Sequence, residues 1–481
     1  MADTSPVTLD QLGRVHLVGI GGAGVSVIAR LLRALGVHVQ GSDAVESPTL
    51  AALRADGVPV WVGHDASHVI GPDGVALVDT VVVSTAVRDI NPELAAARAA
   101  GIRVLHRSEA LAALMARGRA IAVAGAHGKT TTSAMIVAVL AAAGVDASYA
   151  IGSTVCFQSS SGVVNQPGGH LGIADVLVAE ADESDGSFLN YAPDIAVVTN
   201  VEPDHLDHYG TREAFEQAFV QFAGRVRSGG WLVACADDAG AARLADAHRA
   251  AGGNVVTYGR GEADVRVVGT ESPRIAGGPF GALSRPLEVK VPGEHNLLNA
   301  AAAVTVAALM AVDPAAAVAG AAAFLGTGRR FELRGEVGGV RVIDDYAHHP
   351  TEIAATLAAA RTQAGVGRVL VLFQPHLYSR TKTFAAEFAA VLSAADEVVV
   401  TGVYRSREDV DPTVTASTIA DLVDETATGG EMKPIEDRFE AATAIATKAK
   451  PGDLVLTVGA GDVTELAPVI LDALSQRQDP I

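Results

Sequence analysis

Short runs of Val, Ile and Leu alternate with longer stretches rich in Ala and Leu along most of this chain. Short apolar β-branched runs are typical of strands buried on both faces, and the longer stretches are typical of helices. Such an alternation predicts βαβ units with parallel sheets, and hence an α/β fold.

The first segment shows the pattern from its start. We predict strands at Val15–Val18, Val37–Val39 and Val78–Ser84, and helices at Val25–Leu35 and Asn91–Ala100. The helical stretch Ser108–Ala116 and the basic turn Arg117–Arg119 have the character of a linker.

The β–α pattern begins again at Ala120–Ala124 and a third time after Gly326-Thr327-Gly328. The further strands predicted are Asp175–Glu180, Ile195–Asn200, Trp231–Ala234, Val340–Ile343, Arg368–Phe373, Glu397–Thr401 and Leu454–Val458. Alternating short runs in Gly259–Pro292 indicate an antiparallel appendage, and Ala300–Val312 indicates a buried helix. We therefore predict three α/β domains, over residues 1–118, 119–327 and 328–481.

Composition narrows the classes of function. Hydrophobic residues make up 49% of the 481 residues but aromatic residues only 4%, so the cores must be built mainly from Ala, Val, Leu and Ile. The formal net charge of −19 argues against a nucleic-acid or anionic-membrane partner, because phosphate backbones require clustered Lys and Arg. A small anionic substrate held by local donors is still compatible with this charge.

Two cysteines, Cys156 and Cys235, provide neither a disulfide framework nor a zinc pattern, which fits a reducing compartment. The N-terminal residues lack a basic stretch followed by an apolar core, and the longest apolar run is shorter than a membrane span. We expect a cytoplasmic protein without a signal peptide.

The first glycine-rich turn is GIGGAG, from Gly19 to Gly24, between a predicted strand and a helix. Glycines such as Gly21 and Gly22 let the backbone approach a diphosphate at a helix N-terminus. Asp43 lies 19 residues beyond Gly24, which formally completes a dinucleotide fingerprint. We favour phosphate binding, with Ser84 at the end of a later predicted strand as a further substrate contact; tight strand–helix packing is the alternative.

A second loop opens the central domain, where a buried strand leads into GAHGKTTT and an apolar helix. Its backbone N–H groups are expected to hold phosphates, Lys129 to neutralise the β- and γ-oxygens, and Thr130 to ligate Mg²⁺. The nucleotide-binding residues predicted here are Gly125, Ala126, His127, Gly128, Lys129, Thr130 and Thr131.

Acidic segments follow two of the central strands, at EADESD from Glu180 and at VEPDHLDH from Val201. Ligands bind at the carboxyl ends of parallel strands, and carboxylates beside a phosphate loop require a cation between them. We predict Glu180 and His205 as metal ligands. Asp182, Asp185 and Asp207 are equally well explained as solvated loop residues.

Seven strings occur in a fixed order along the chain: GAHGKTTT, EADESDGSF, TNVEPDHLDHYG, PGEHNLLNAAAA, GTGRRFELRG, DDYAHHPTE and FQPHLYSRT. Together they resemble the Mur ligases. The resemblance covers nearly the whole chain and implies an N-terminal Rossmann-like domain for a UDP-linked substrate, a central P-loop ATPase-like domain, and a C-terminal Rossmann-like domain that closes on ATP and the amino acid.

The same resemblance implies roles for single residues. Lys129, Glu180, His205 and Arg330 would be catalytic, with one Mg²⁺ on Thr130 and Glu180 and a second on His205. Asn296 and Asn299 would contact the adenine end of ATP, Arg330 the γ-phosphate and Asp345 the ribose. A helix cap and a surface ion pair are the alternatives for the two asparagines and for Arg330.

For the amino acid, the resemblance implies contacts from His348, His349, His376 and Arg380. The family often has Arg where this chain has Leu377, which leaves Arg380 as the expected carboxylate clamp. The implied reaction joins L-alanine to the lactyl carboxylate of UDP-N-acetylmuramate through an acyl phosphate, in a monomer or homodimer. His205 and His348 are both candidates for the base that deprotonates the amine.

Three other functions remain open from the sequence. A related ligase could attach a recycled tripeptide to the same UDP-sugar. The first glycine turn alone would fit an NAD-dependent dehydrogenase, which explains neither GAHGKTTT nor the acidic loops. A non-catalytic UDP-sugar sensor would not need Lys129, Glu180, His205 and Arg330 together.

Overall fold

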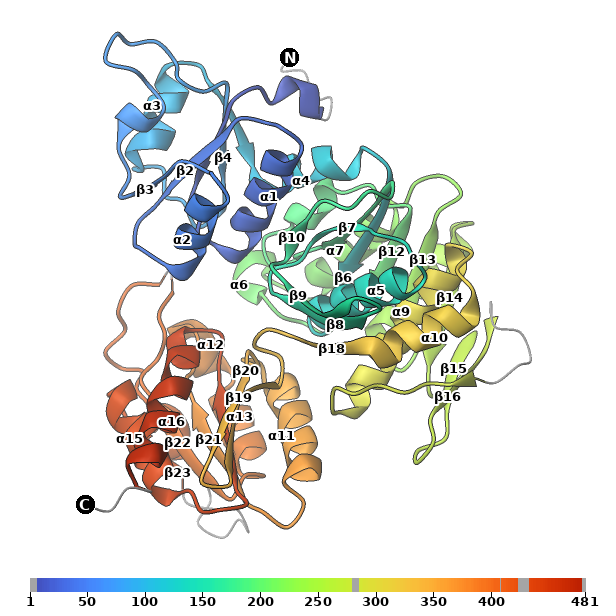
Figure 1. The fold of residues 1–481 in the computed structure, drawn as a ribbon, viewed down its shortest axis with the longest axis vertical. Coiled ribbons are helices and arrows are strands. Elements are labelled where there is room, and N and C mark those ends of the chain that lie inside the picture. The colour runs from blue at the N-terminus through green and yellow to red at the C-terminus, as the bar shows by residue number, and fades with distance from the viewer. Residues whose placement is uncertain (1–6, 279–284, 407, 423–431, 478–481) are drawn as a thin grey trace. The chain divides into compact units, whose positions relative to one another are not determined.

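The structure is a computed structural model that describes residues 7–278, 285–406, 408–422 and 432–477. The chain forms two units (Figure 1). One unit comprises residues 1–290 and 297–325, and the other comprises residues 291–296 and 326–481. The α/β fold and its parallel sheets are confirmed.

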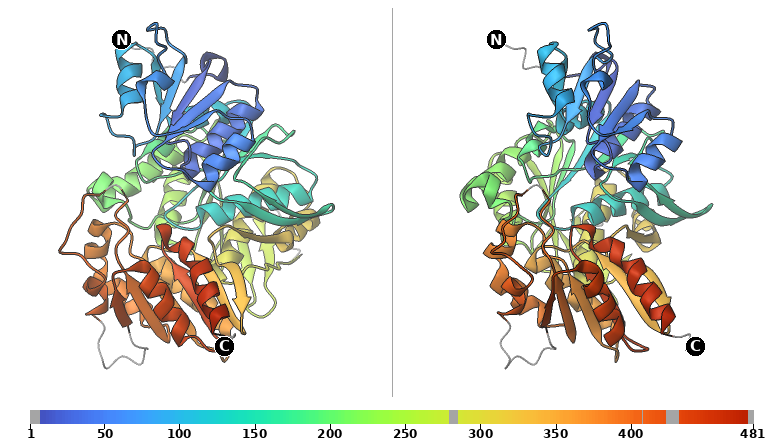
Figure 2. Two further views of the ribbon diagram at one scale, coloured as in Figure 1. Left: turned by 60° about the vertical axis from the view of Figure 1, so that its left-hand side comes forward. Right: turned by 90° about the vertical axis from the view of Figure 1, so that its left-hand side faces the viewer.

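The N-terminal sheet of the first unit is parallel, and its strand order is β3 (Val60–Val62), β2 (Val39–Asp43), β1 (Val15–Val18), β4 (Thr80–Val83) and β5 (Arg103–His106). Because parallel crossovers are right-handed, α1 (Ala23–Ala34) and α2 (Pro48–Ala55) cover one face and α3 (Pro92–Ala99) covers the other (Figures 1 and 2). The order reverses beside β1, so the first glycine turn lies at a topological switch point, where ligands bind in such sheets.

The strand predicted at Val37–Val39 is wrong in its bounds. Gly36 has φ +82° and ends the turn after α1, and the Val37 N–H donates to the Leu32 carbonyl at 3.0 Å. This backbone bond closes the helix, so β2 begins only at Val39 and runs to Asp43.

The central sheet of the same unit is mainly parallel. Its order is β10 (Gly169–His170), β7 (Ser148–Ala150), β11 (Val176–Glu180), β6 (Arg119–Ala124), β12 (Ile195–Val198), β13 (Trp231–Cys235), β14 (Asn254–Gly259), β15 (Val265–Val268), β16 (Arg274–Gly277) and β17 (Arg285–Pro286). Strands β15, β16 and β17 pair antiparallel, as predicted for this stretch. The acidic loops therefore follow β11 and β12, the two neighbours of the strand that leads into the phosphate loop.

Helices of the central region include α5 (Lys129–Ala142), α7 (Arg212–Ala223), α8 (Ala239–Ala250), α9 (Glu294–Leu309) and α10 (Pro314–Ala323). The predicted buried helix at Ala300–Val312 corresponds to the later part of α9. A small sheet has the order β18 (Phe324–Thr327), β8 (Val155–Ser159) and β9 (Gly162–Gln166). Over the part of the chain that the structure describes, no helix combines the length and apolar character needed to cross a bilayer.

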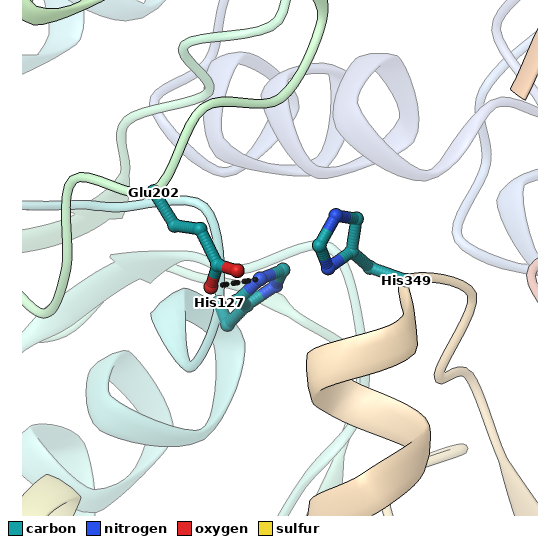
Figure 3. Close-up of side chains that lie close together, drawn as sticks. All are labelled: His127, Glu202 and His349. Carbon is teal, nitrogen blue, oxygen red and sulfur yellow. Dashed lines mark ion pairs between the residues drawn. The ribbon is translucent and has the colours of Figure 1, made fainter. Parts of the chain in front are cut away.

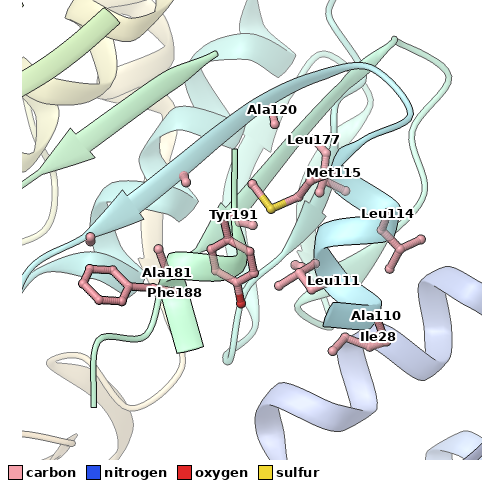
Figure 4. Packing of buried hydrophobic residues seen from close by; sticks show 14 of the residues in the cluster. Ile28, Ala110, Leu111, Leu114, Met115, Ala120, Leu177, Ala181, Phe188 and Tyr191 are labelled. Atoms are coloured by element: carbon pink, nitrogen blue, oxygen red, sulfur yellow. The ribbon is translucent and has the colours of Figure 1, made fainter. Parts of the chain in front are cut away.

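One hydrophobic core joins the N-terminal and central sheets (Figure 4). Helix α4 (Arg107–Met115) presents Leu111 and Met115 to this core, which also contains Ile28 of α1 and Leu177 of β11. The short helix η3 (Ser187–Asn190) adds Phe188. Apolar side chains from both sheets thus leave water together, which explains why the predicted linker region is a packed element.

The C-terminal unit contains a sheet with the order β19 (Glu332–Val337), β20 (Val340–Asp345), β24 (Leu454–Val458), β21 (Val369–Phe373), β22 (Glu397–Thr401) and β23 (Met432–Ile435). Helices α11 (Pro350–Ala364) and α13 (Ala385–Leu392) cover one face, and α15 (Arg438–Lys448) and α16 (Leu466–Gln476) cover the other (Figure 2). Strand β19 alone is antiparallel to its neighbour. Each face of the parallel strands is therefore buried, as their continuous apolar sequences predict.

Candidate active site

The phosphate loop is a tight turn between β6 and α5. Gly125 has φ +133° and Gly128 has φ +82°, conformations that glycine adopts most readily. The Thr199 hydroxyl donates to the His127 carbonyl at 2.5 Å, and Asn200 Oδ1 accepts the His127 N–H at 3.0 Å. A Cβ on Gly125 would lie 2.1 Å from Thr199 Oγ1. The turn is therefore shaped by residues that follow β12, as well as by its own glycines.

Lys129 begins α5 and its ammonium group lies among acceptors. Nζ donates to Glu183 Oε1 at 2.9 Å and to the carbonyl of Gly125 at 2.7 Å. Burial acts to lower the pKa of Lys129, but the attraction of Glu183, Asp182 and Glu180 outweighs it and raises that pKa. Lys129 is thus held as a cation beside the turn, and its hydrogen bond to Glu183 fixes the position of the ammonium group.

Glu183 is a site residue that the sequence analysis missed. Its side chain is fully buried, and burial raises its pKa although Lys129 acts to lower it. EADESD offers four carboxylates in six residues, and only the path of the loop after β11 decides which of them faces Lys129. The signal that could have found it is this alternation of acidic and small residues beside a phosphate loop.

Two buried carboxylate oxygens at this edge have no hydrogen-bond partner, Glu180 Oε1 and Glu183 Oε2. The other oxygen of Glu180 accepts the Gly152 N–H at 2.8 Å. His205, at φ +52°, places Nε2 3.9 Å from Glu183 Oε1. Unpaired buried oxygens are costly and suit a divalent cation, so the donors present fit the predicted Mg²⁺.

Asp182 and Asp185 are not simple solvated loop residues. Asp182 Oδ2 accepts from Arg107 Nη2 at 2.6 Å, and although burial acts to raise it, Arg107 and Lys129 lower the pKa of Asp182 to about 2. Asp185 accepts from the Thr85 hydroxyl and lies 3.6 Å from His106 Nε2. These partners belong to the N-terminal sheet region, so the acidic loop ties the two sheets together. The side chain of Asp207 lies outside the described residues.

His127 forms an ion-pair contact with Glu202, its Nε2 lying 3.3 Å from Oε2 (Figure 3). Both residues lie in loops at the carboxyl ends of β6 and β12. His349, which the figure also draws, belongs to the C-terminal unit.

The first glycine turn is held by the end of β2. Asp43 Oδ2 accepts the Gly21 N–H at 2.9 Å, and a Cβ on Gly21 would lie 2.4 Å from Leu50 Cδ1. Gly22 is the N-cap of α1, and a Cβ there would lie 3.3 Å from the Gly19 carbonyl oxygen. Gly21 is therefore required for packing, whatever it binds. Ser84 lies just beyond β4 and its carbonyl accepts the Val87 N–H.

The two asparagines of α9 are both buried. Asn299 Oδ1 accepts from the Thr132 hydroxyl at 3.1 Å and lies 3.0 Å from where a Cβ on Gly128 would be, so it contacts the phosphate-loop helix. Asn296 Nδ2 donates to the Pro292 carbonyl at 2.6 Å, a local contact near the start of its helix. Their adenine contacts remain predictions.

In the C-terminal unit, Arg330 Nη1 lies 3.5 Å from Glu352 Oε1, and its guanidinium lies over the Tyr346 ring at 5.1 Å. Both oxygens of Asp345 accept backbone N–H groups, from Phe331 and from Ala347, at 2.8 Å. Burial raises the pKa of Asp345 to about 6, against the opposing effect of Arg330. Asp345 thus fixes the backbone next to Arg330. A ribose contact would use the remaining lone pairs of the Asp345 carboxylate.

The histidines of this unit form a small cluster. The rings of His348 and His376 meet edge to face with centroids 5.9 Å apart, and His376 stacks on Tyr404 at 5.7 Å. His348 Nδ1 lies 3.4 Å from Glu352 Oε2. His349 is the N-cap of α11, which is a structural role.

Arg380 lies in α12 (Tyr378–Thr383) and is mostly buried. The helix is preceded by Leu377, which has φ +66°, a conformation costly for a bulky residue. Leu377 is itself buried, and its carbonyl accepts from the Thr381 hydroxyl at 2.7 Å. The apolar residue at this position is therefore used in packing.

Comparisons with known proteins agree along the chain. Family models match in three places: the Mur ligase family catalytic domain over residues 14–119, the Mur ligase middle domain over 123–307, and the Mur ligase glutamate ligase domain over 329–461. UDP-N-acetylmuramate–L-alanine ligases of Kineococcus radiotolerans and Renibacterium salmoninarum are 56% and 53% identical to this chain. The alignments cover 97% and 98% of this chain and 97% of each relative.

Solved structures give the same picture. The UDP-N-acetylmuramate–alanine ligase of Thermotoga maritima has a TM-score of 0.78 at 29% identity, over 97% of this chain and all of that one. A murein peptide ligase of Psychrobacter arcticus has a TM-score of 0.72 at 25% identity, over 96% and 99% of the two chains. Similarity over nearly the whole length leaves no support for a dehydrogenase built on the first glycine turn alone.

The contact between Arg107 and Asp182 predicts strong energetic coupling. We expect Arg107→Ala and Asp182→Ala each to lower the free energy of unfolding, because each leaves a partner charge without compensation in a half-buried site. In the double variant the losses should fall short of the sum by about 1–3 kcal/mol, measured by chemical denaturation. Arg212→Ala and Glu216→Ala, an exposed pair on one helix, serve as the control, with coupling below about 1 kcal/mol. Additive losses at Arg107 and Asp182 would contradict a direct link.

Proposed function

This chain belongs to the Mur ligase family, and within it we propose that the chain joins L-alanine to the lactyl carboxylate of UDP-N-acetylmuramate with cleavage of ATP to ADP and phosphate. The observation that carries the proposal is full-length identity above half to ligases of that activity, together with a phosphate loop, Lys129 and paired acidic loops at one sheet edge. The reaction is a cytoplasmic step, because it consumes ATP and a UDP-linked sugar.

The chemical problem is that a carboxylate is a poor electrophile at neutral pH. Attack of the lactyl carboxylate oxygen on the γ-phosphorus breaks the bond to ADP and forms an acyl phosphate. The amine of alanine then attacks the acyl carbon, and phosphate leaves from a tetrahedral intermediate. The protein contributes positioning and neutralisation of charge.

For ATP, we assign the phosphates to the N–H groups of the turn from Gly125 to Gly128 and the start of α5. Lys129 supplies a positive charge, and the buried Glu183 beside it sets where that charge lies. We assign Asn296 and Asn299 to the adenine end, Asp345 to the ribose and Arg330 to the transferring phosphoryl group. Arg330 suits that role because its guanidinium is always charged and offers several donors.

For Mg²⁺, we propose Thr130, Glu180 and His205 as ligands and add Glu183. The support is the pair of unpaired buried oxygens on Glu180 and Glu183, which a divalent cation would satisfy. When bound, the ion would neutralise the phosphate charge that these carboxylates would otherwise repel.

For the UDP-sugar, we assign the diphosphate to the turn containing Gly21 and Gly22 at the N-terminus of α1, with Asp43 holding that turn. We assign Ser84, which follows the strand paired with β1, as a further contact. For alanine, we assign His348, His376 and Arg380 of the C-terminal unit. Either His205 or His348 deprotonates the amine, and a pH profile of the variants would distinguish them.

Lys129→Ala should abolish ADP formation while the dissociation constant for UDP-N-acetylmuramate, measured by calorimetry, stays within about threefold of wild type. Lys129→Ala leaves the buried carboxylate of Glu183 without its partner. The double variant Lys129→Ala/Glu183→Gln removes that charge as well and should therefore fold. Lys448→Ala is the matched control, since Lys448 pairs with Glu397 at 2.6 Å away from the loop, and it should keep its turnover. If a folded Lys129→Ala keeps a tenth of the wild-type turnover, the loss is only about 1.4 kcal/mol. That result would contradict the assignment of Lys129 to the phosphates.

Substrate choice is tested with a panel of amino acids. With ATP, Mg²⁺ and UDP-N-acetylmuramate, phosphate release should require an amino acid and prefer L-alanine. Glycine and L-serine should be poorer by only about 1–3 kcal/mol, because one methyl or hydroxyl group gives little discrimination in an apolar pocket. Arg380→Ala should raise the KM for L-alanine far more than that for ATP.

The same assay includes the tripeptide L-Ala-γ-D-Glu-diaminopimelate and D-glutamate. Preference for the tripeptide would make the chain a recycling ligase, and preference for D-glutamate would place it with another member of the family. Either result would contradict the proposed substrate.

A further inference from the structure

A buried polar cluster in the N-terminal sheet region has no part in the chemistry above. Glu93, in the first turn of α3, is fully buried, and its carboxylate lies among Ser42, His16, His64 and His68. The Ser42 hydroxyl donates to Oε2 at 2.6 Å and His68 Nδ1 lies 2.6 Å from Oε1. His64 Nδ1 and His16 Nε2 lie 3.2 Å and 3.4 Å from Oε2.

This cluster is expensive to bury, and it is well compensated. Burial acts to raise the pKa of Glu93, but the contacts with His16, Ser42 and His68 outweigh it and lower that pKa to about 2. In the described part of the chain no lysine or arginine pairs with Glu93. Apolar residues would stabilise such a position at least as well, whereas a satisfied polar network fixes one geometry.

The geometry that it fixes is that of Ser42. A hydroxyl has one proton, which Ser42 gives to Glu93, so the 2.9 Å contact with His64 Nδ1 requires the imidazole to be the donor. The Ser42 hydroxyl is therefore held from two sides. Ser42 lies near the end of β2, next to Asp43.

The backbone of Ser42 in turn holds the first glycine turn. Its carbonyl accepts the N–H of Gly19 at 2.8 Å and that of Ile20 at 3.0 Å. The next N–H, that of Gly21, donates to Asp43 Oδ2. Three consecutive N–H groups of the turn are thus bound by Ser42 and Asp43 of β2. The side chain of Ser42 is in turn hydrogen-bonded to Glu93.

We propose that Glu93 is a positioning residue for the UDP-linked substrate: acting through Ser42, it fixes the glycine turn that receives the diphosphate. The inference rests on the proposed function. The N–H groups of Gly19, Ile20 and Gly21 are used within the protein, so the donors left for an anion are those at the start of α1. Such backbone donors bind an anion well only when the turn before them already points them at it, because ordering them on binding reduces affinity. His64 and His68 complete the carboxylate's hydrogen bonds, and His16 lies 3.4 Å from it.

The test compares Ser42→Ala, Glu93→Gln and Glu93→Ala by calorimetric titration with UDP-N-acetylmuramate in the absence of ATP. Ser42→Ala and Glu93→Ala should weaken binding by about tenfold or more, since each removes the hydrogen bond that anchors Ser42. Glu93→Gln keeps an oxygen that can accept the Ser42 proton and should bind within about threefold of wild type. The KM for ATP should not change in any of them, because the ATP loop belongs to the other sheet.

Thr80→Val is the matched control. Thr80 is also fully buried in this sheet, and its hydroxyl donates to the Leu12 carbonyl at 2.7 Å, away from the glycine turn. It should lower stability in chemical denaturation and leave binding of the UDP-sugar unchanged. If Ser42→Ala loses stability as Thr80→Val does and still binds like wild type, the network is structural only and the proposal is wrong.

Failure of a variant to fold and failure of the proposed function give results that can be distinguished. If Glu93→Ala does not fold, Ser42→Ala against Glu93→Gln still decides, and equal weakening in those two would contradict the role of the carboxylate oxygen. A wild-type protein that binds UDP-N-acetylmuramate but shows no alanine-dependent turnover contradicts the proposed function, while the binding series continues to test Glu93.

Discussion

The buried contact between Lys129 and Glu183 is the interaction on which the rest of the first unit depends. Glu183 is fully buried, and Lys129 lies 2.9 Å from it at the start of α5. Removing one member of a buried pair costs about 3–5 kcal/mol, because the other charge is left without a partner. The phosphate loop after β6 and the acidic loop after β11 therefore hold one position relative to each other.

The residue before Glu183 extends this constraint. Asp182 binds Arg107, whose guanidinium Nη1 lies 3.2 Å from where a Cβ on Gly24 would be, beside the first glycine turn. Glu183 thus contacts the lysine of the ATP-type loop, and Asp182 binds the arginine that lies beside the diphosphate-type turn. The proposed substrate would place its diphosphate on one turn and its carboxylate toward the other. It therefore needs the two turns at a fixed distance, and the common core around α4 holds the two sheets together.

The sequence predicted the architecture well because apolar periodicity reports burial directly. The strands at Val15–Val18, Glu397–Thr401 and Leu454–Val458 have the predicted bounds, whereas the strand at Val37–Val39 was misplaced because backbone closure at Gly36 has no apolar signature. Motif order identified the family, which the comparisons confirm.

Side-chain partners were harder to predict. Glu183 was overlooked among four carboxylates, and Asp182 and Asp185 were left open as solvated residues, because their partners Lys129, Arg107 and Thr85 lie far away in sequence. The Glu93 network was invisible for the same reason, since it draws on β1, β2, η2 (Ala66–His68) and α3. The roles of single residues toward ATP, Mg²⁺ and alanine, and the three domain boundaries, remain predictions.

In the proposed reaction the two loops bring the lactyl carboxylate into attack on the γ-phosphate. The most direct measurement is a reaction with UDP-N-acetylmuramate labelled with oxygen-18 in that carboxylate, followed by mass analysis of the released phosphate. An acyl phosphate requires that a carboxylate oxygen leave with the phosphate, so labelled phosphate should appear in step with the amide product. Unlabelled phosphate formed at the same rate as product would contradict the account.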